Sequence, residues 1–153
     1  MMLAEITEPE LADFTSAYGT PAKEHIEALV VDSDAFDCVK LVHIAARSQQ
    51  LDIGVTACRS LADAGAALAS QHYDVIYLEY WLGDETTIAF IHEMTGAGTP
   101  CIVLTDLNEP DIRRIAFRAG AQAFLAKDSL GPQALESVTL AVLRPQLCAR
   151  AAA

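Results

Sequence analysis

The chain has 153 residues, a formal net charge of −11 and a hydrophobic content of 52%. These values fit one folded domain and exclude a largely disordered chain. The acidic balance disfavours nucleic acid and anionic membrane surfaces as partners, because both need basic residues. No apolar run approaches the roughly 20 residues of a membrane span, and no basic signal-peptide start is present. We therefore expect a cytoplasmic protein.

The four cysteines lie far apart in the sequence, at positions 38, 58, 101 and 148. They form no C-x-x-C pair and no Cys/His cluster with the spacing of a zinc site. We expect them to be reduced and structural, as is usual in the cytosol.

The first 24 residues are polar and acidic, and Gly19-Thr20-Pro21 separates them from the rest. We interpret residues 1–24 as an arm outside the core, with a short helix at 8–17. Residues 25–145 are expected to form the domain and 146–153 a tail, because a proline at position 145 should end the last helix.

Strand-like and helix-like segments alternate after the arm. Short apolar runs predict buried strands at 28–31, 53–57, 74–78, 100–104 and 123–126. Capping residues and apolar periodicity predict helices at 35–48, 60–69, 86–94, 108–120 and 132–144, with Asn108 as the cap of the fourth. Five strand–helix units predict an α/β fold, in which a parallel sheet lies between helices.

Two of the predicted helices are apolar on more than one side. In the first, the face expected to pack on the sheet consists of Phe36, Val39, Val42 and Ala46. The residues expected to point away from the sheet are Leu41 and Ile44. In the last helix, the sheet-facing residues should be Leu135, Val138 and Val142. The residues off that face are Leu140, Leu143 and, beyond the proline, Leu147. Apolar helix faces are usually covered, so we predict a homodimer or a partner complex through the last helix. Packing of these leucines on the arm is the alternative.

Polar side chains follow four of the predicted strands, at the sheet edge where ligands bind in such folds. The first strand leads into Asp32, Ser33 and Asp34. The third, fourth and fifth strands lead into Glu79, Thr105 and Lys127. Taken singly, each has a structural explanation as a cap, a solvated strand end or a local ion pair. Together they indicate a site for an anion, a hard cation or both.

Four segments carry a family resemblance: LVVDSD at 29–34, YDVIYLEYWLGD at 73–84, PCIVLT at 100–105 and AGAQAFLAKDSL at 119–130. Through them, residues 26–144 resemble the receiver domain of bacterial two-component response regulators. The resemblance implies a flavodoxin-like (βα)5 doubly wound sheet of strand order 2-1-3-4-5. It also implies phosphoryl transfer from a histidine kinase to an aspartate, with Mg²⁺ held by acids after the first strand.

The chain departs from the family pattern at the acceptor and at the metal site. Glu79 stands where the family has its phosphorylated aspartate, and Ser33 replaces the second acid of the Mg²⁺ pair, which leaves Asp32. Thr105 matches the hydroxyl that contacts the phosphoryl group, and Lys127 matches the family lysine. The aromatic switch position falls on Phe124, and Asp128 replaces the usual proline after the lysine.

These departures predict a degenerate receiver, or pseudo-receiver. Glutamate places its carboxylate about one C–C bond deeper in the pocket, and phosphoryl transfer tolerates such displacement poorly. Mg²⁺ needs well-placed carboxylates, so its binding at Asp32 should be weak or absent and no cofactor is expected. The carboxylate of Glu79 is instead expected to pair with Lys127.

We therefore expect a stand-alone signalling protein that is not an enzyme and acts by binding. Its partners would be a histidine kinase, a phosphotransferase or another response regulator. The alternative is an active single-domain regulator that accepts a phosphoryl group, through another acid such as Asp84 or Asp32. A small-ligand flavodoxin-like module is a more remote alternative, because no Gly-rich phosphate loop follows the first strand. No G-x-S-x-G elbow supports a hydrolase.

Overall fold

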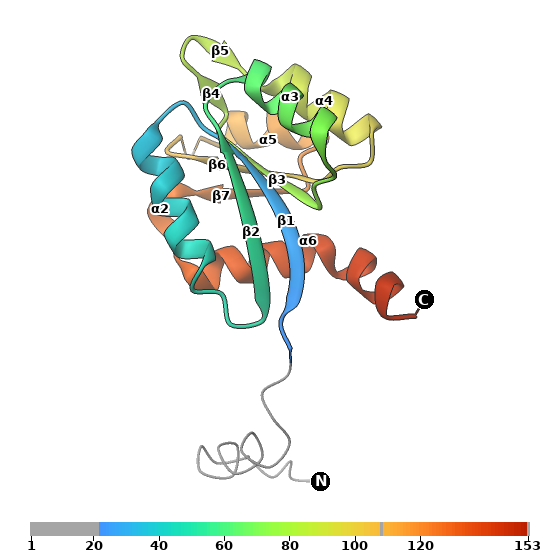
Figure 1. The fold of residues 1–153 in the computed structure, drawn as a ribbon. Coiled ribbons are helices and arrows are strands. Elements are labelled where there is room, and N and C mark those ends of the chain that lie inside the picture. Colours follow the sequence, from blue (N-terminus) through green and yellow to red (C-terminus); the bar gives the residue numbers. More distant parts are fainter. Residues whose placement is uncertain (1–21, 108, 153) are drawn as a thin grey trace, which may run out of the picture.

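The computed structural model describes residues 22–107 and 109–152, so the predicted helix at 8–17 and the predicted cap Asn108 lie outside the described residues. A five-stranded parallel sheet forms the centre of the domain (Figure 1). Its strands are β1 (Glu24–Val31), β2 (Leu51–Cys58), β3 (Val75–Leu78), β6 (Cys101–Thr105) and β7 (Ala123–Ala126). The spatial order β2-β1-β3-β6-β7 confirms the predicted doubly wound topology.

Helices cover both faces of this sheet. They are α2 (Ala35–Ala45), α3 (Leu61–Ser70), α4 (Ile88–Gly96), α5 (Pro110–Ala119) and α6 (Pro132–Ala152). A 3-10 turn, η1 (Lys127–Ser129), joins β7 to α6. Figure 1 shows α2 and α6 on one face and α3, α4 and α5 on the other.

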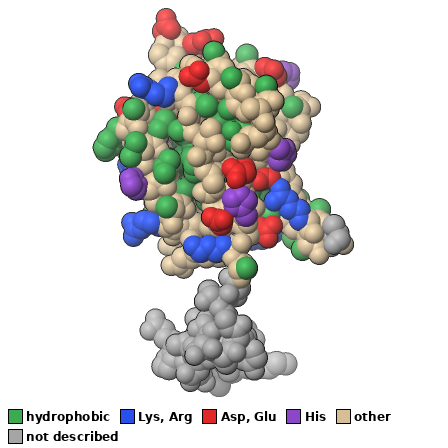
Figure 2. Space-filling view, viewed as in Figure 1, with side chains coloured by type: hydrophobic (Ala, Val, Ile, Leu, Met, Phe, Trp, Pro, Cys, Tyr) green, Lys and Arg blue, Asp and Glu red, His purple; other side chains and the backbone are tan. Residues whose placement is uncertain are grey.

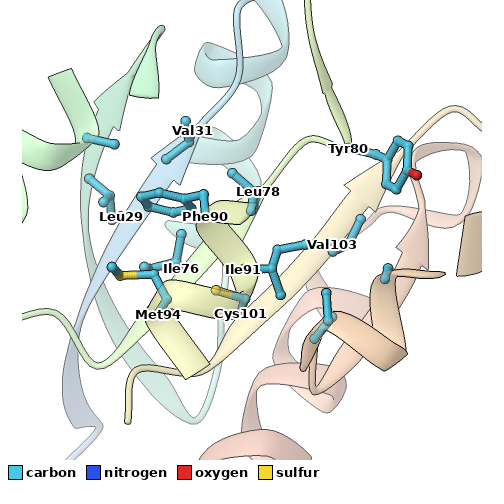
Figure 3. Close-up of a cluster of buried hydrophobic side chains, with 14 of the residues drawn as sticks. Leu29, Val31, Ile76, Leu78, Tyr80, Phe90, Ile91, Met94, Cys101 and Val103 are labelled. Atoms are coloured by element: carbon cyan, nitrogen blue, oxygen red, sulfur yellow. The ribbon is translucent and has the colours of Figure 1, made fainter. Parts of the chain in front are cut away.

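Each face of the sheet has its own apolar core, because alternate residues of a strand point to opposite faces. Under α3, α4 and α5, residues such as Leu29, Ile76 and Val103 meet Phe90 and Ile91 (Figure 3). On the other face the cluster consists of Ile26, Ala28, Val30, Cys38, Leu41, Ala45, Leu51, Val75, Tyr77, Ile102, Leu104, Leu135 and Leu143. The near-continuous apolar strands of the sequence are therefore explained by burial on both sides.

Two helix boundaries show how local chemistry sets the elements. The hydroxyl of Ser60 accepts a 3.1 Å hydrogen bond from the N–H of Asp63 and caps α3, as predicted. Gly120 ends α5 with φ of 114°, a left-handed conformation that glycine adopts without strain.

The predicted orientation of the first helix was wrong. Helix α2 buries Cys38, Leu41 and Ala45, whereas Phe36 and Val39 are 75% and 54% exposed. Both sets of residues follow helical spacing, so periodicity alone does not distinguish them. The buried set lies on the side of the helix that also carries Asp37, which reaches the sheet edge.

The predicted end of the last helix was also wrong, since α6 continues through Pro145 to Ala152. Proline there removes one backbone hydrogen bond, but contacts further along retain the helix. Leu147 packs against the core, and the guanidinium of Arg150 bonds to the buried carboxylate of Asp74. Leu143, expected off the sheet-facing side, is 1% exposed and belongs to the core.

A short hairpin between β3 and α4 was not predicted. It consists of β4 (Trp81–Leu82) and β5 (Glu85–Thr86), which pair in antiparallel fashion. Its turn carries Asp84, an exposed side chain. Within the described ranges, no helix combines the length and apolar character that a membrane crossing needs.

Candidate functional site

The carboxyl ends of four neighbouring strands bring the predicted polar residues together. Asp32 follows β1, Glu79 follows β3, Thr105 ends β6 and Lys127 follows β7. These strands lie side by side and run in the same direction, so their ends meet at one edge of the sheet. All four side chains are largely buried, with exposed fractions of 12% or less.

The ammonium of Lys127 lies at the centre of this cluster. Its Nζ is 2.7 Å from Oδ2 of Asp32, 2.8 Å from Oδ2 of Asp37 and 2.7 Å from Oε2 of Glu79. The ion pair expected between Glu79 and Lys127 is therefore present. Burial alone would lower the pKa of Lys127, but the three carboxylates outweigh it and raise the pKa well above its ordinary value. The lysine is charged at every physiological pH.

The second oxygen of Glu79 is held by Thr105. Oγ1 of this buried threonine donates a 2.7 Å hydrogen bond to Oε1 of Glu79 and accepts a 3.2 Å bond from the N–H of Leu107. The contact of Oε2 with Lys127 is ionic and lacks the angles of a hydrogen bond. Glu79 thus has one oxygen on the hydroxyl and the other on the ammonium.

The three residues after β1 do not all enter the pocket. Oδ1 of Asp32 accepts a 3.0 Å bond from the N–H of Asp34, while its other oxygen faces Lys127. Ser33 is exposed, and its backbone carbonyl accepts two hydrogen bonds from the Arg59 guanidinium. Asp34 caps α2 by accepting from the N–H groups of Phe36 and Asp37. Only Asp32 of the predicted acidic group contributes a side chain to the site.

Asp37 is a site residue that the sequence did not predict. It stands in the first turn of α2, where an acid is favourable beside the helix N-terminus in any case. Its position, three residues after the capping Asp34, places it on the helix side that faces the strand ends. That spacing was the only available signal, because the contact with Lys127 spans 90 residues.

The residues present do not fit a Mg²⁺ ion. Both oxygens of Asp32 and both of Glu79 already face a hydroxyl, an N–H or the Lys127 ammonium. Ser33, at the position of the second acid, is an exposed residue and supplies no carboxylate. Among residues 22–107 and 109–152, no cluster of three or more His, Cys, Asp or Glu side chains is arranged to hold a metal ion. The ammonium of Lys127 supplies the positive charge among these carboxylates.

The predicted switch residue Phe124 lies on β7 and packs partly buried against the core under α3, α4 and α5. The guanidinium carbon of Arg113, on α5, lies 5.8 Å from the centre of its ring and 5.7 Å from that of Phe117. This distance is typical of a cation–π contact. The contact links α5 to β7, the strand that Lys127 follows.

The geometry agrees with comparisons to known proteins. The family model of the response regulator receiver domain matches residues 28–139, well over half of the chain. No curated protein matches.

Solved structures share the fold. A two-component response regulator from Clostridium difficile is 24% identical, with a TM-score of 0.69 over 78% of this chain and 96% of that one. The signal receiver domain of an HD domain-containing protein from Pseudomonas fluorescens Pf-5 is 19% identical, with a TM-score of 0.70 over 83% and 99%. The BeF3-activated receiver domain of Klebsiella pneumoniae RstA is 18% identical, with a TM-score of 0.67 over 77% and 98%. The family match and this shared fold lead to one conclusion: the chain belongs to the response regulator receiver domain family of two-component signal transduction.

Proposed function

We propose that this protein is a degenerate receiver that signals by protein–protein contact without being phosphorylated. Its partner would be a histidine kinase, a phosphotransferase or another response regulator. The observation that carries the proposal is the 2.7 Å hydrogen bond from Thr105 to Glu79, together with the ion pair from Glu79 to Lys127. One oxygen of Glu79 contacts the Thr105 hydroxyl and the other contacts the Lys127 ammonium. A phosphoryl group on an aspartate at this position would offer oxygens to the same two groups.

Phosphoryl transfer needs a free carboxylate oxygen in line with the donor and a metal ion to offset the charge of the phosphate. Glu79 presents neither oxygen free, and the carboxylates of Asp32 and Asp37 are bound to the same Lys127 ammonium. Mg²⁺ would have to displace the ammonium, and it prefers well-placed carboxylates in octahedral geometry. This arrangement supports a site in which Glu79, Thr105 and Lys127, called the switch face below, are held in one state.

The test uses the purified full chain with Mg²⁺ and acetyl phosphate. We expect intact-protein mass spectrometry to show no added phosphoryl group, and the fluorescence of Trp81, two residues from Glu79, to stay unchanged. The matched variant is Ser33→Asp with Glu79→Asp, which restores both family acids. It should gain Mg²⁺-dependent phosphorylation, whereas Glu79→Asp alone should gain little.

Phosphorylation of the wild-type protein at Glu79 or Asp32 would overturn the proposal and favour the active regulator. Modification at Asp84 would do the same, although that side chain lies in the hairpin turn. Tight binding of Mg²⁺ to the wild-type chain in a calorimetric titration would contradict the metal argument separately.

A homodimer through the last helix also stays a prediction. Because Leu143 is buried and Leu140 and Leu147 pack partly buried against the core, only the exposed parts of Leu140 and Leu147 remain for such an interface. Light scattering on the full chain and on Leu140→Ser with Leu147→Ser tests it, and a monomer at high concentration would contradict it.

A further inference from the structure

The outward side of α2 is an apolar strip with a basic rim. Phe36, Val39 and Val42 are 75%, 54% and 40% exposed, so three large hydrophobic side chains face solvent on one helix. The groove beside them, called the α2 groove below, is lined by Phe36, Val39, Lys40, His43, Ile44 and Arg47. Figure 2 shows hydrophobic side chains with Lys, Arg and His around them on the left of the molecule, over α2.

Such a strip favours an occupant, because contiguous exposed apolar surface on a helix is usually covered. The rim indicates the charge of that occupant. In a chain of net charge −11, three basic side chains line this one groove. Across the described ranges, no carboxylate forms an ion pair with Lys40, His43 or Arg47. The groove therefore suits an amphipathic segment with acids beside its apolar face.

Residues 7–18 of the same chain, TEPELADFTSAY, have this pattern. Thr7 and Glu10 have the spacing of a capping box, and Pro9 suits the first turn of a helix. At 100° per residue, Leu11, Phe14 and Tyr18 share one face, with Glu8 and Glu10 on its two sides. Gly19 then suits the helix end. The segment combines an apolar face with flanking negative charge.

The chain also enters the described part of the fold next to this groove. The ammonium of Lys23 donates a 2.8 Å hydrogen bond to the carbonyl of Ser48, in the loop that follows α2. The N–H of Glu24 bonds to the carbonyl of Gln50 at 3.3 Å. The link at 19–22 can span about 13 Å when extended. Residues 8–18 as a helix would be about 16 Å long, like the 11 residues of α2.

We propose that residues 7–18 form an amphipathic helix that docks in cis on the α2 groove. Leu11, Phe14 and Tyr18 cover the apolar strip, and the acids face the basic rim. The short link keeps Tyr18 near the end of α2 that carries Arg47. The proposal is independent of whether Glu79 is phosphorylated, and it assigns the α2 surface an occupant within the chain.

The first experiment measures proximity in the full-length protein. A spin label on Ser16→Cys, in a Cys148→Ala background that removes the exposed cysteine, should broaden amide resonances of α2, most strongly at 43–47. Adding Leu11→Asp with Phe14→Asp should abolish this broadening. Ala12→Asp with Ser16→Asp adds the same charge on the opposite side of the predicted helix, with the label then placed on Thr15→Cys, and should retain it.

The second experiment changes the groove. Val39→Asp with Val42→Asp alters two exposed positions, so the fold should persist, and the label at position 16 should no longer broaden α2. An apolar dye should bind Leu11→Asp with Phe14→Asp several-fold more strongly than the charge control. Equal dye binding, or no broadening in the wild-type chain, would overturn the proposal. Isotope-labelled chains without a spin label can also be mixed with spin-labelled chains. Broadening of the α2 resonances of the chains without a spin label would assign the groove to a second copy and would overturn docking in cis.

Discussion

Asp37 and Lys127 lie 90 residues apart in the sequence, and Oδ2 of Asp37 is 2.8 Å from Nζ of Lys127. Through this contact the first helix after β1 is tied to the residue that follows the last strand of the sheet. The same ammonium pairs with Glu79, so one side chain contacts both α2 and the residue at the acceptor position.

A double-mutant cycle with Asp37→Asn and Lys127→Met should show coupling between these two residues. We expect a coupling energy of about 1–2 kcal/mol in the free energy of unfolding, measured by urea denaturation. Asp37 also stands in the first turn of α2, where a charge alone is worth about 0.3–1 kcal/mol. A coupling near zero would mean that Asp37 acts only on its helix.

Replacement of Lys127 by alanine should destabilise the protein strongly. Three largely buried carboxylates would lose their shared cation, and breaking a buried ion pair costs about 3–5 kcal/mol. Because the folded state raises the pKa of Lys127, its contribution is fully present below the ordinary value of 10.5 and is lost only as pH rises through the higher folded value.

Chemical denaturation at neutral pH checks the Lys127→Ala prediction. Arg118→Ala is the control, because that side chain is exposed on α5, away from both Lys127 and the α2 groove, and its loss should cost under about 1 kcal/mol. A loss that small for Lys127→Ala would contradict the central role of its ammonium.

Thr105→Val should loosen Glu79, whereas Thr105→Ser should not. Valine keeps the shape of threonine but removes the donor to Oε1 of Glu79 and the acceptor for the N–H of Leu107. An unpaired buried polar group costs about 1–3 kcal/mol. Hydrogen exchange at 105–107 should accelerate in the valine variant and stay near the wild-type rate in the serine variant. Equal exchange in both variants would remove the evidence that this hydroxyl holds the switch face.

The sequence predicted well those elements whose local pattern fits only one kind of secondary structure. The run at 123–126 is wholly apolar between Gly120 and Lys127, and the structure has its strand at Ala123–Ala126. The strand order was implied by the family resemblance, and the meeting of Glu79, Thr105 and Lys127 at one edge follows from parallel topology.

The parts that it did not predict depend on tertiary contacts. Helix α2 has apolar residues at helical spacing on two sides; the buried side is the one that packs on the core and carries Asp37, whose partner Lys127 lies 90 residues away. Pro145 would end an isolated helix. In the continuation to Ala152, Leu147 packs against the core and Arg150 pairs with Asp74, the residue directly before β3, which no local pattern connects with Arg150.

The last prediction concerns this Asp74 contact and its dependence on pH. Burial alone would raise the pKa of Asp74, but the N–H of Glu27 and the guanidinium of Arg150 hold the pKa below its ordinary value of 3.8. A carboxyl with a depressed pKa contributes stability that is present above the ordinary value and is lost as pH falls through the folded one.

Asp74→Asn should therefore lower the free energy of unfolding at about pH 6 and match the wild type more closely as the pH falls below the ordinary value of 3.8 and through the lower folded pKa of Asp74. Asp84→Asn, in the exposed hairpin turn, is the control and should leave the acid limb of the stability curve unchanged. Arg150→Gln should resemble Asp74→Asn at neutral pH and should increase hydrogen exchange after Pro145. If the difference between wild type and Asp74→Asn stays constant across this pH range, the carboxylate does not anchor the end of α6 by its charge.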